Sequence, residues 1–196
     1  MPTAEPCRVV AVLLAAGSSR RFGEDKLAAT HRGLPLFEHA LGALLASPEI
    51  GSTVAVVKPG SSLASPRPGC TWVENPDHAE GMGASLRAGV RAAPADADAY
   101  LVALADMPGV TPRLVAELVG AFRASGLDFL VPVHRGRRGH PVLLSARHRA
   151  ALLEVGGDVG ARELLASSPD RVCWHPTEDP AVVLDVDSPA DLAGAP

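Results

Sequence analysis

The chain has 196 residues, of which 47% are hydrophobic, 20% charged and 4% aromatic, and its formal net charge is −4. This length can bury a full core, which small aliphatic side chains must fill because aromatic ones are scarce. The slightly acidic charge, without any block of Lys and Arg, excludes wholesale binding to the phosphates of nucleic acids.

Cysteine usage and the first apolar run indicate the compartment. Cys7, Cys70 and Cys173 stand far apart without a CxxC pair, which favours neither a disulfide framework nor a zinc site. The apolar run 9–16 is too short to cross a membrane, and we interpret it as a buried first strand rather than a signal-peptide core. We therefore expect a cytoplasmic protein.

The first two thirds of the chain alternate between predicted strands and helices. Residues 8–14 and 53–57 are continuous Val- and Leu-rich runs, typical of buried strands. Helical spacing, helix-capping residues and further apolar runs then predict the other elements: a helix over 36–46 behind Pro35, a strand over 71–74, a helix over 84–91, a strand over 99–104, a helix from Thr111 to 122 and a strand over 127–133.

The pattern changes after residue 133. We expect a basic loop over 136–139, a strand over 141–144, helices over 146–154 and 159–166, strands near Val172 and over 182–184, and a last helix starting at Ser188 and Pro189. The Ser-, Pro- and Gly-rich segment 59–69 predicts a surface loop. The alternation predicts one three-layer α/β domain over residues 1–196, with a mostly parallel, Rossmann-like sheet. Ligands of such sheets bind beyond the carboxyl ends of the strands.

The loop after the first predicted strand has the composition of an anion site. Its small residues let backbone N–H groups approach a phosphate, while Arg21 and Lys26 add positive charge. It has neither the Walker A spacing nor the Rossmann glycine fingerprint. Taken alone, the loop is equally well interpreted as a solvated surface turn.

Acidic residues follow a strand and recur near the end of the sequence. Asp106 comes just after the strand over 99–104, where its carboxylate could hold Mg²⁺, although capping the next helix is the alternative. Asp185 and Asp187 share one face if their segment is extended, so that Asp187, with Asp185 as second choice, could join Asp106. Capping by Asp187 or Ser188 is again the alternative.

The chain resembles the MobA-like nucleotidylyltransferases, whose signature is LAAGxSxRFG followed shortly by Lys. The matching residues are Leu14, Ala15, Ala16, Gly17, Ser19, Arg21, Phe22, Gly23 and Lys26. The resemblance implies that Gly17 and Ser19 bind the triphosphate, while Arg21 and Lys26 neutralise charge during transfer. Asp106 matches the family's metal-binding LxDMP motif, and in related transferases a residue from the region of Asp187 completes the magnesium site.

Three further segments resemble molybdenum cofactor cytidylyltransferases, in the same order along the chain. Residues 75–89 are similar to their NP…GM..SL..G stretch, 139–143 to GHPV and 157–162 to GD.GAR. Candidates for contacts with the base and ribose are Asn75, Gly81 and Ser85. Arg162 is a candidate for binding the acceptor's phosphate, and His140 for contacting the pterin or orienting its phosphate. The alternatives are a solvated Arg162 and a structural His140. The other six histidines show no pattern: His31, His39, His78, His134, His148 and His175.

The sequence therefore predicts a Mg²⁺-dependent nucleotidylyltransferase whose N-terminal part binds the NTP and whose C-terminal part binds the acceptor. CTP is the expected donor, because the pair Ala15-Ala16 resembles the cytidylyl branch of the family, whereas the guanylyl branch has Gly-Gly. The expected acceptor is the phosphate of molybdopterin. Guanylyl transfer, and a non-catalytic accessory protein that hands nucleotide or cofactor to a molybdenum hydroxylase, are the alternatives. A hydroxylase or its maturation factor is an expected partner; nucleic acid and membrane are not.

Overall fold

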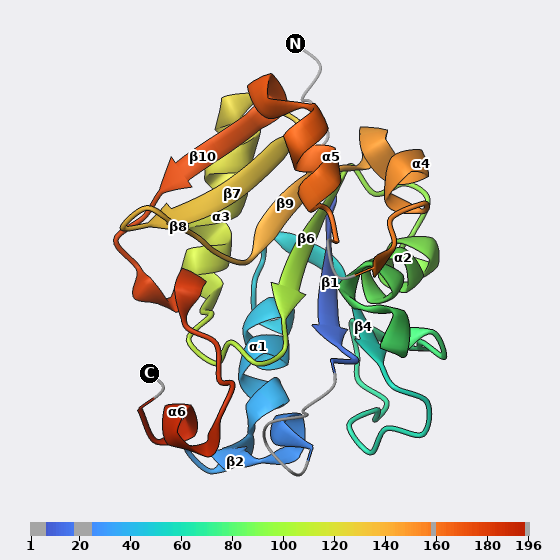
Figure 1. Ribbon diagram of the computed structural model, residues 1–196, viewed down its shortest axis with the longest axis vertical. Coiled ribbons are helices and arrows are strands. Elements are labelled where there is room, and N and C mark those ends of the chain that lie inside the picture. The colour runs from blue at the N-terminus through green and yellow to red at the C-terminus, as the bar shows by residue number, and fades with distance from the viewer. Residues whose placement is uncertain (1–6, 18–24, 158–159, 195–196) are drawn as a thin grey trace.

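The computed structural model describes residues 7–17, 25–157 and 160–194, and its centre is a single large sheet (Figure 1). The sheet has eight strands in the order β10-β7-β9-β6-β1-β4-β5, with β8 paired to β7. Its strands are β1 (Val9–Ala15), β4 (Ile50–Val57), β5 (Cys70–Glu74), β6 (Ala99–Leu104), β7 (Phe129–His134), β8 (Arg137–Arg138), β9 (Val142–Ser145) and β10 (Val172–Pro176). A separate small hairpin consists of β2 (Thr30–His31) and β3 (Leu34–Pro35).

Strand direction confirms the predicted, mostly parallel sheet. β1 pairs in parallel with β4 and β6, β4 with β5, and β7 with β10. β9 is antiparallel to both β6 and β7 and so joins the two parallel groups. In Figure 1 the arrowheads of β1 and β6 point to the end of the molecule where β2 and α6 lie.

Helices cover both faces of the sheet, which makes a three-layer α/β fold. They are α1 (Leu36–Leu45), α2 (Met82–Ala92), α3 (Pro112–Ser125), α4 (Arg149–Leu152), α5 (Arg162–Ser167) and α6 (Pro189–Gly194). Alternate residues of β1 from Val9 to Ala15 pack with α1 and α3. The others, from Val10 to Leu14, pack with α2 and α4, as does Ala16 just after the strand. Because both faces of β1 are buried, the strand is apolar throughout. Gly89 lets α2 lie close to β1, since a Cβ there would overlap the Val12 side chain.

Two predictions in the second half of the chain are wrong. The segment 182–184, expected as a strand, belongs largely to the 3-10 helix η6 (Pro180–Val183), which starts where the Asp179 side chain accepts a hydrogen bond from the Ala181 N–H at 2.9 Å. The loop expected over 136–139 contains β8, because Arg135 and Gly136, with φ of 49° and 78°, form a tight turn after β7. Consecutive positive φ values suit the turns of two-residue hairpins.

The helices predicted over 146–154 and 159–166 are shorter than expected. The first consists of the 3-10 helix η3 (Ala146–His148) followed by α4, and the second, within its described part, is α5. Among the residues that the structure describes, no helix has the length and apolar character needed to span a bilayer.

Candidate active site

A charged cluster lies beyond the carboxyl ends of β1 and β6, with Lys26 at its centre. Lys26 begins the 3-10 helix η1 (Lys26–Ala28), where the Asp25 side chain caps the helix by accepting a hydrogen bond from the Leu27 N–H. The Lys26 Nζ donates to Asp106 Oδ2 at 2.7 Å, to the Val186 carbonyl at 2.8 Å and to Asp187 Oδ1 at 3.1 Å. Three predicted site residues from distant parts of the sequence therefore meet at one point.

Backbone hydrogen bonds hold the two acidic residues in place. The Ala105 N–H donates to the Leu14 carbonyl, which keeps the chain beyond β6 beside β1, and the Val186 N–H donates to the Asp106 carbonyl at 2.9 Å. The backbone N–H groups of Asp187 and Ser188 both donate to the Asp191 carboxylate, at 3.2 and 2.8 Å. The Asp191 carboxylate thus accepts the hydrogen bonds of the backbone N–H groups at the start of α6, and the Asp187 carboxylate is left to contact Lys26.

The charges of the cluster shift the pKa values of its members. Burial acts to lower the pKa of Lys26, but the Asp106 carboxylate, the hydrogen bonds to both acids and the charge of Asp187 outweigh it, so the pKa lies above its ordinary value. Lys26 is therefore charged at neutral pH. The pKa of Asp185 is raised, first by loss of hydration and then by the nearby charges of Asp106 and Asp187.

The acidic residues of the cluster could supply oxygen ligands to a divalent cation. Asp106 Oδ1 is buried and has no hydrogen-bond partner within the described residues, which leaves one acceptor oxygen for a ligand. The described ranges contain no group of three or more His, Cys, Asp or Glu placed to hold a metal. Mg²⁺ is commonly bound by only one or two carboxylates, completed by waters and substrate phosphates. Asp106 and Asp187 fit that mode of binding.

A hollow of about 430 Å³ lies next to this cluster. Residues of the loop after β1, of the β5–α2 connection, of α2 and of the end of β6 line it, among them Ala16, Gly17, His78, Gly81, Ser85 and Asp106. Gly81 has a φ of 115°, which favours glycine at the point where the chain turns into α2. Gly83 is needed as well, since a Cβ there would meet the backbone of Gly156 and Gly157, which cross the start of the helix.

The nucleotide-binding candidates do not all face this hollow. Ala16 and Ala15 are both buried, at 1% and 3% exposed. Ala16 belongs to the core on the α2 and α4 face and lines the hollow, whereas Ala15 belongs to the core on the α1 and α3 face and does not. Asn75 is also buried; its Nδ2 donates to Ser85 Oγ at 3.1 Å and its Oδ1 accepts from the Asp77 N–H. Asn75 thus fixes Ser85, which lines the hollow. Ser19 and Arg21 lie outside the described residues.

The two acceptor-binding candidates come from the last third of the chain: His140 lies just before β9, and Arg162 begins α5. The His140 N–H donates to the Val182 carbonyl at 2.8 Å, and its ring Nδ1 lies 3.5 Å from the Val102 carbonyl. Burial lowers the pKa of His140, and the charge of Arg162 acts in the same direction, against the Val102 carbonyl and Asp106. Arg162 is exposed at the start of α5. The charges of Asp106 and Arg162 both act on the His140 ring, so both groups belong to its electrostatic environment. The roles of His140 and Arg162 in binding the acceptor stay predictions.

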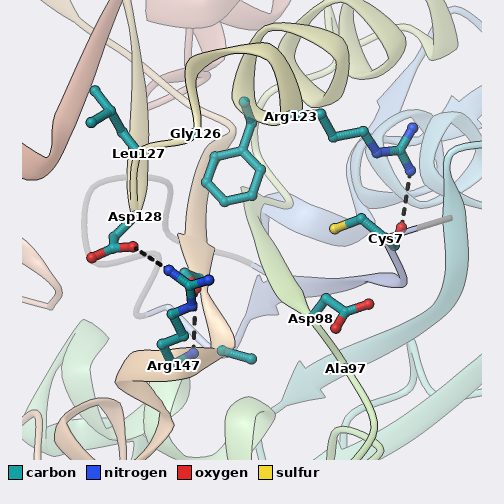
Figure 2. A pocket seen from close by; sticks show the side chains of 11 residues that line it. Cys7, Ala97, Asp98, Arg123, Gly126, Leu127, Asp128 and Arg147 are labelled. Atoms are coloured by element: carbon teal, nitrogen blue, oxygen red, sulfur yellow. Dashed lines mark hydrogen bonds and ion pairs between the residues drawn. The ribbon is translucent and has the colours of Figure 1, made fainter. Parts of the chain in front are cut away.

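A larger hollow of about 630 Å³ lies at the opposite end of the sheet, where β6 and β7 begin (Figure 2). Its charged groups are already paired: Asp128 accepts hydrogen bonds from the Arg171 guanidinium at 2.9 and 3.0 Å, and Arg123 donates to the Cys7 carbonyl. Hydrogen bonds from Arg171 lower the pKa of Asp128 to about 2. Since ligands bind at the other end of such sheets, this hollow is not the candidate site.

The fold and the cluster together define a class of protein. A mostly parallel α/β sheet, with a lysine paired to two carboxylates and an adjoining hollow beyond the carboxyl ends of its strands, suits a protein that binds a nucleoside phosphate. Residues 11–172 match the MobA-like NTP transferase domain, and the chain belongs to that family.

Several characterised relatives are similar to this chain. The 2-C-methyl-D-erythritol 4-phosphate cytidylyltransferase of Bordetella petrii is 32% identical over 132 residues, covering 63% of this chain and 58% of that protein. The purine catabolism protein PucB of Bacillus subtilis is 30% identical over 178 residues, covering 81% of each. A probable molybdenum cofactor guanylyltransferase of Thermococcus gammatolerans is 29% identical over 147 residues, covering 75% of this chain and 73% of that one. The match thus spans little more than half the length of the first relative.

Solved structures share the fold over almost the whole chain. Rv0371c of Mycobacterium tuberculosis superimposes with a TM-score of 0.82 at 23% identity, covering 96% of this chain and 97% of that one. The manganese complex of the same protein gives a TM-score of 0.76 at 22% identity, covering 95% and 97%. These likenesses confirm the predicted fold class.

Proposed function

We propose that this nucleotidyltransferase transfers CMP from CTP to the phosphate of a molybdopterin-type acceptor and releases pyrophosphate. The observation that carries the proposal is the position of Lys26, held by Asp106 and Asp187 beside a hollow large enough for a nucleoside. In this proposal the whole chain acts as one domain, with nucleotide bound over β1 and α2 and acceptor toward His140 and Arg162.

The names of the relatives support the donor and the acceptor separately. Transfer of a cytidylyl group is stated for the Bordetella petrii relative, and the Thermococcus gammatolerans relative is named for the molybdenum cofactor. CTP is proposed as the donor because the Ala15-Ala16 pair resembles the cytidylyl branch of the family. Of these two residues, Ala16 lines the hollow. Its methyl group would narrow the space available to a purine.

The reaction needs little proton chemistry. An acceptor phosphate is already an anion at neutral pH, so one of its oxygens attacks the α-phosphorus directly while the bond to the bridging oxygen of pyrophosphate breaks. Catalysis is then mostly positioning and neutralisation of charge. Lys26, fixed by hydrogen bonds to Asp106, Val186 and Asp187, offers a positive charge that needs no reorganisation during transfer. Gly17 lets the phosphates approach the backbone after β1.

The residues fit a divalent cation, for which we propose Mg²⁺. Asp106 and Asp187 would hold it, and when bound it would neutralise charge on the phosphates of the substrate. A divalent metal is also supported by Rv0371c, which shares the fold and has been solved as a complex with manganese.

The proposal is tested with pure protein, Mg²⁺, molybdopterin and each of the four NTPs in turn. We expect pyrophosphate release with CTP and a product whose mass equals the acceptor plus CMP. Asp106→Asn should abolish this product, whereas Asp96→Asn, at an exposed ion pair with Arg8, is the matched control and should not. Pyrophosphate release without acceptor modification would contradict the proposal.

Guanylyl transfer is the second candidate, favoured by the guanylyltransferase relative. The same assay separates the two, since a faster reaction with GTP and a product carrying GMP would replace the cytidylyl proposal. Nucleotide binding without any turnover would favour the accessory protein instead.

A further inference from the structure

His78 lies in the same hollow as Asp106, although nothing in the sequence pattern singles it out. It begins the 3-10 helix η2 (His78–Glu80) in the connection from β5 to α2. Its backbone is fixed on both sides, because its N–H donates to the Asn75 carbonyl and its carbonyl accepts from the Gly81 N–H, both at 3.3 Å. The imidazole is therefore presented from a well-defined position.

The two ring nitrogens of His78 differ in their surroundings. Nδ1 is buried and has no hydrogen-bond partner in the described part of the chain. An N–H group buried without an acceptor is costly, so the proton of a neutral imidazole belongs on Nε2. Nε2 likewise makes no hydrogen bond with the described residues, but it is not closed off from solvent as Nδ1 is. His78 thus offers an N–H donor that the protein itself does not use.

The location of His78 within the site indicates which part of a nucleotide would meet it. Asp106 follows β6 and His78 follows β5, with β1 and β4 between these strands in the sheet. The charges around Lys26, which we propose to bind the phosphates, are on the β6 side. Apolar side chains line the hollow as well, namely Leu14, Ala16, Met82 and Leu104. Apolar walls with a few polar groups are typical of sites that hold a flat ring.

We propose that His78 contacts the nucleobase, donating a hydrogen bond from Nε2 to an acceptor atom on the edge of the pyrimidine, the ring nitrogen N3 or the carbonyl O2. Ser85, fixed by Asn75, would lie on the same side of the hollow. This inference rests on the proposed function, because it requires that the hollow binds a nucleoside triphosphate.

The test measures binding rather than turnover, so that it does not depend on the acceptor. Titration calorimetry with Mg²⁺ compares CTP with inorganic tripolyphosphate, which has the three phosphates but no base. We expect His78→Ala to weaken CTP binding about tenfold, as for a lost hydrogen bond, and to leave tripolyphosphate unchanged. His78→Gln, whose side-chain amide also offers an N–H donor, should stay within about threefold of the wild type for both ligands.

A second histidine serves as the matched control. His175 lies on β10, at the other edge of the sheet, where its ring bonds to Glu117. His175→Ala should change neither affinity, and thermal unfolding of all variants without ligand checks that they are folded.

Each contrary result has its own meaning. An equal loss of both ligands in His78→Ala, or unchanged CTP affinity, would overturn the role in base recognition. Loss of CTP binding in His78→Gln would overturn the proposed hydrogen bond from His78 Nε2 to the base. A wild-type protein that binds tripolyphosphate but no nucleotide would overturn the base contact, whereas one that binds neither would overturn the proposed function as well.

Discussion

Lys26 makes ion pairs with two carboxylates that differ in exposure, and this difference gives a quantitative prediction. The side chains of Lys26 and Asp106 are 13% and 20% exposed, whereas that of Asp187 is 54% exposed. A charge-assisted hydrogen bond that is mostly removed from water contributes about 1.5–3 kcal/mol, and an exposed ion pair about 0–1 kcal/mol. We therefore expect Lys26 to couple more strongly to Asp106 than to Asp187 in the ligand-free protein.

Double-mutant cycles measure the two couplings directly. The variants are Lys26→Met, which keeps the aliphatic stem, Asp106→Asn, Asp187→Asn and the two double variants that contain Lys26→Met. Urea unfolding in the presence of EDTA gives the free energy of unfolding of each, so that no metal substitutes for the lost charge. The exposed pair of Arg8 and Asp96 is the control and should show a coupling near zero. A coupling to Asp187 as large as that to Asp106 would refute the reasoning.

Three further predictions follow from the site and from the opposite end of the sheet. Asp106→Asn should lower kcat/KM at least about a hundredfold, because losing a charge that stabilises the transition state of transfer costs about 2.7 kcal/mol or more. Circular dichroism should show that this variant keeps the native fold. A loss below fivefold would contradict the proposed role. Ala16→Gly should raise kcat/KM for GTP relative to CTP by about tenfold, whereas Ala15→Gly, its matched control in the core, should lower stability and leave that ratio unchanged. The pKa of Asp128 is about 2, below its ordinary 3.8, so its ionised form stabilises the fold above pH 4. We expect this contribution to be about 1 kcal/mol, because solvent screening reduces the full linkage value. It should be lost as the pH falls toward 2. Unfolding measured between pH 6 and 2 should show this loss in the wild type, and its persistence in Asp128→Asn would rule out Asp128 as the cause.

The elements with strong local signals were predictable from the sequence. The strand over 99–104 coincides with β6, and α3 begins at Pro112 with the Thr111 side chain accepting from the Leu114 N–H at 3.2 Å. The segment 182–184 was predicted wrongly because its three apolar residues fit a strand as well as a helix. Its conformation depends on a distant contact, in which the Val182 carbonyl accepts from the His140 N–H.

The residue types of the candidate site were predictable, but not all of their contacts. Lys26 is separated by 80 residues from Asp106 and by 161 from Asp187, and no local pattern specifies a pair across such a distance. The location of His78 in the site was not predictable, because a single histidine forms no sequence pattern. Only the path of the β5–α2 connection brings it into the hollow. The different environments of Ala15 and Ala16 could have been foreseen, because neighbouring residues on a strand face opposite sides.

The hydrogen bonds from Lys26 to Val186 and Asp187 also bear on how the protein is made. The ribosome synthesises β1 and Lys26 first and the segment with Val186 and Asp187 about 160 residues later, after all eight strands of the sheet. At about 5–20 residues per second, many seconds separate these events. A nascent chain therefore has time to form most of its sheet while the cluster proposed for transfer still lacks Val186 and Asp187, which are two of the hydrogen-bond acceptors of Lys26 among the described residues. Interrupted synthesis before Val186 would yield a fragment that keeps the pair of Lys26 and Asp106 but lacks the contacts of Lys26 with Val186 and Asp187.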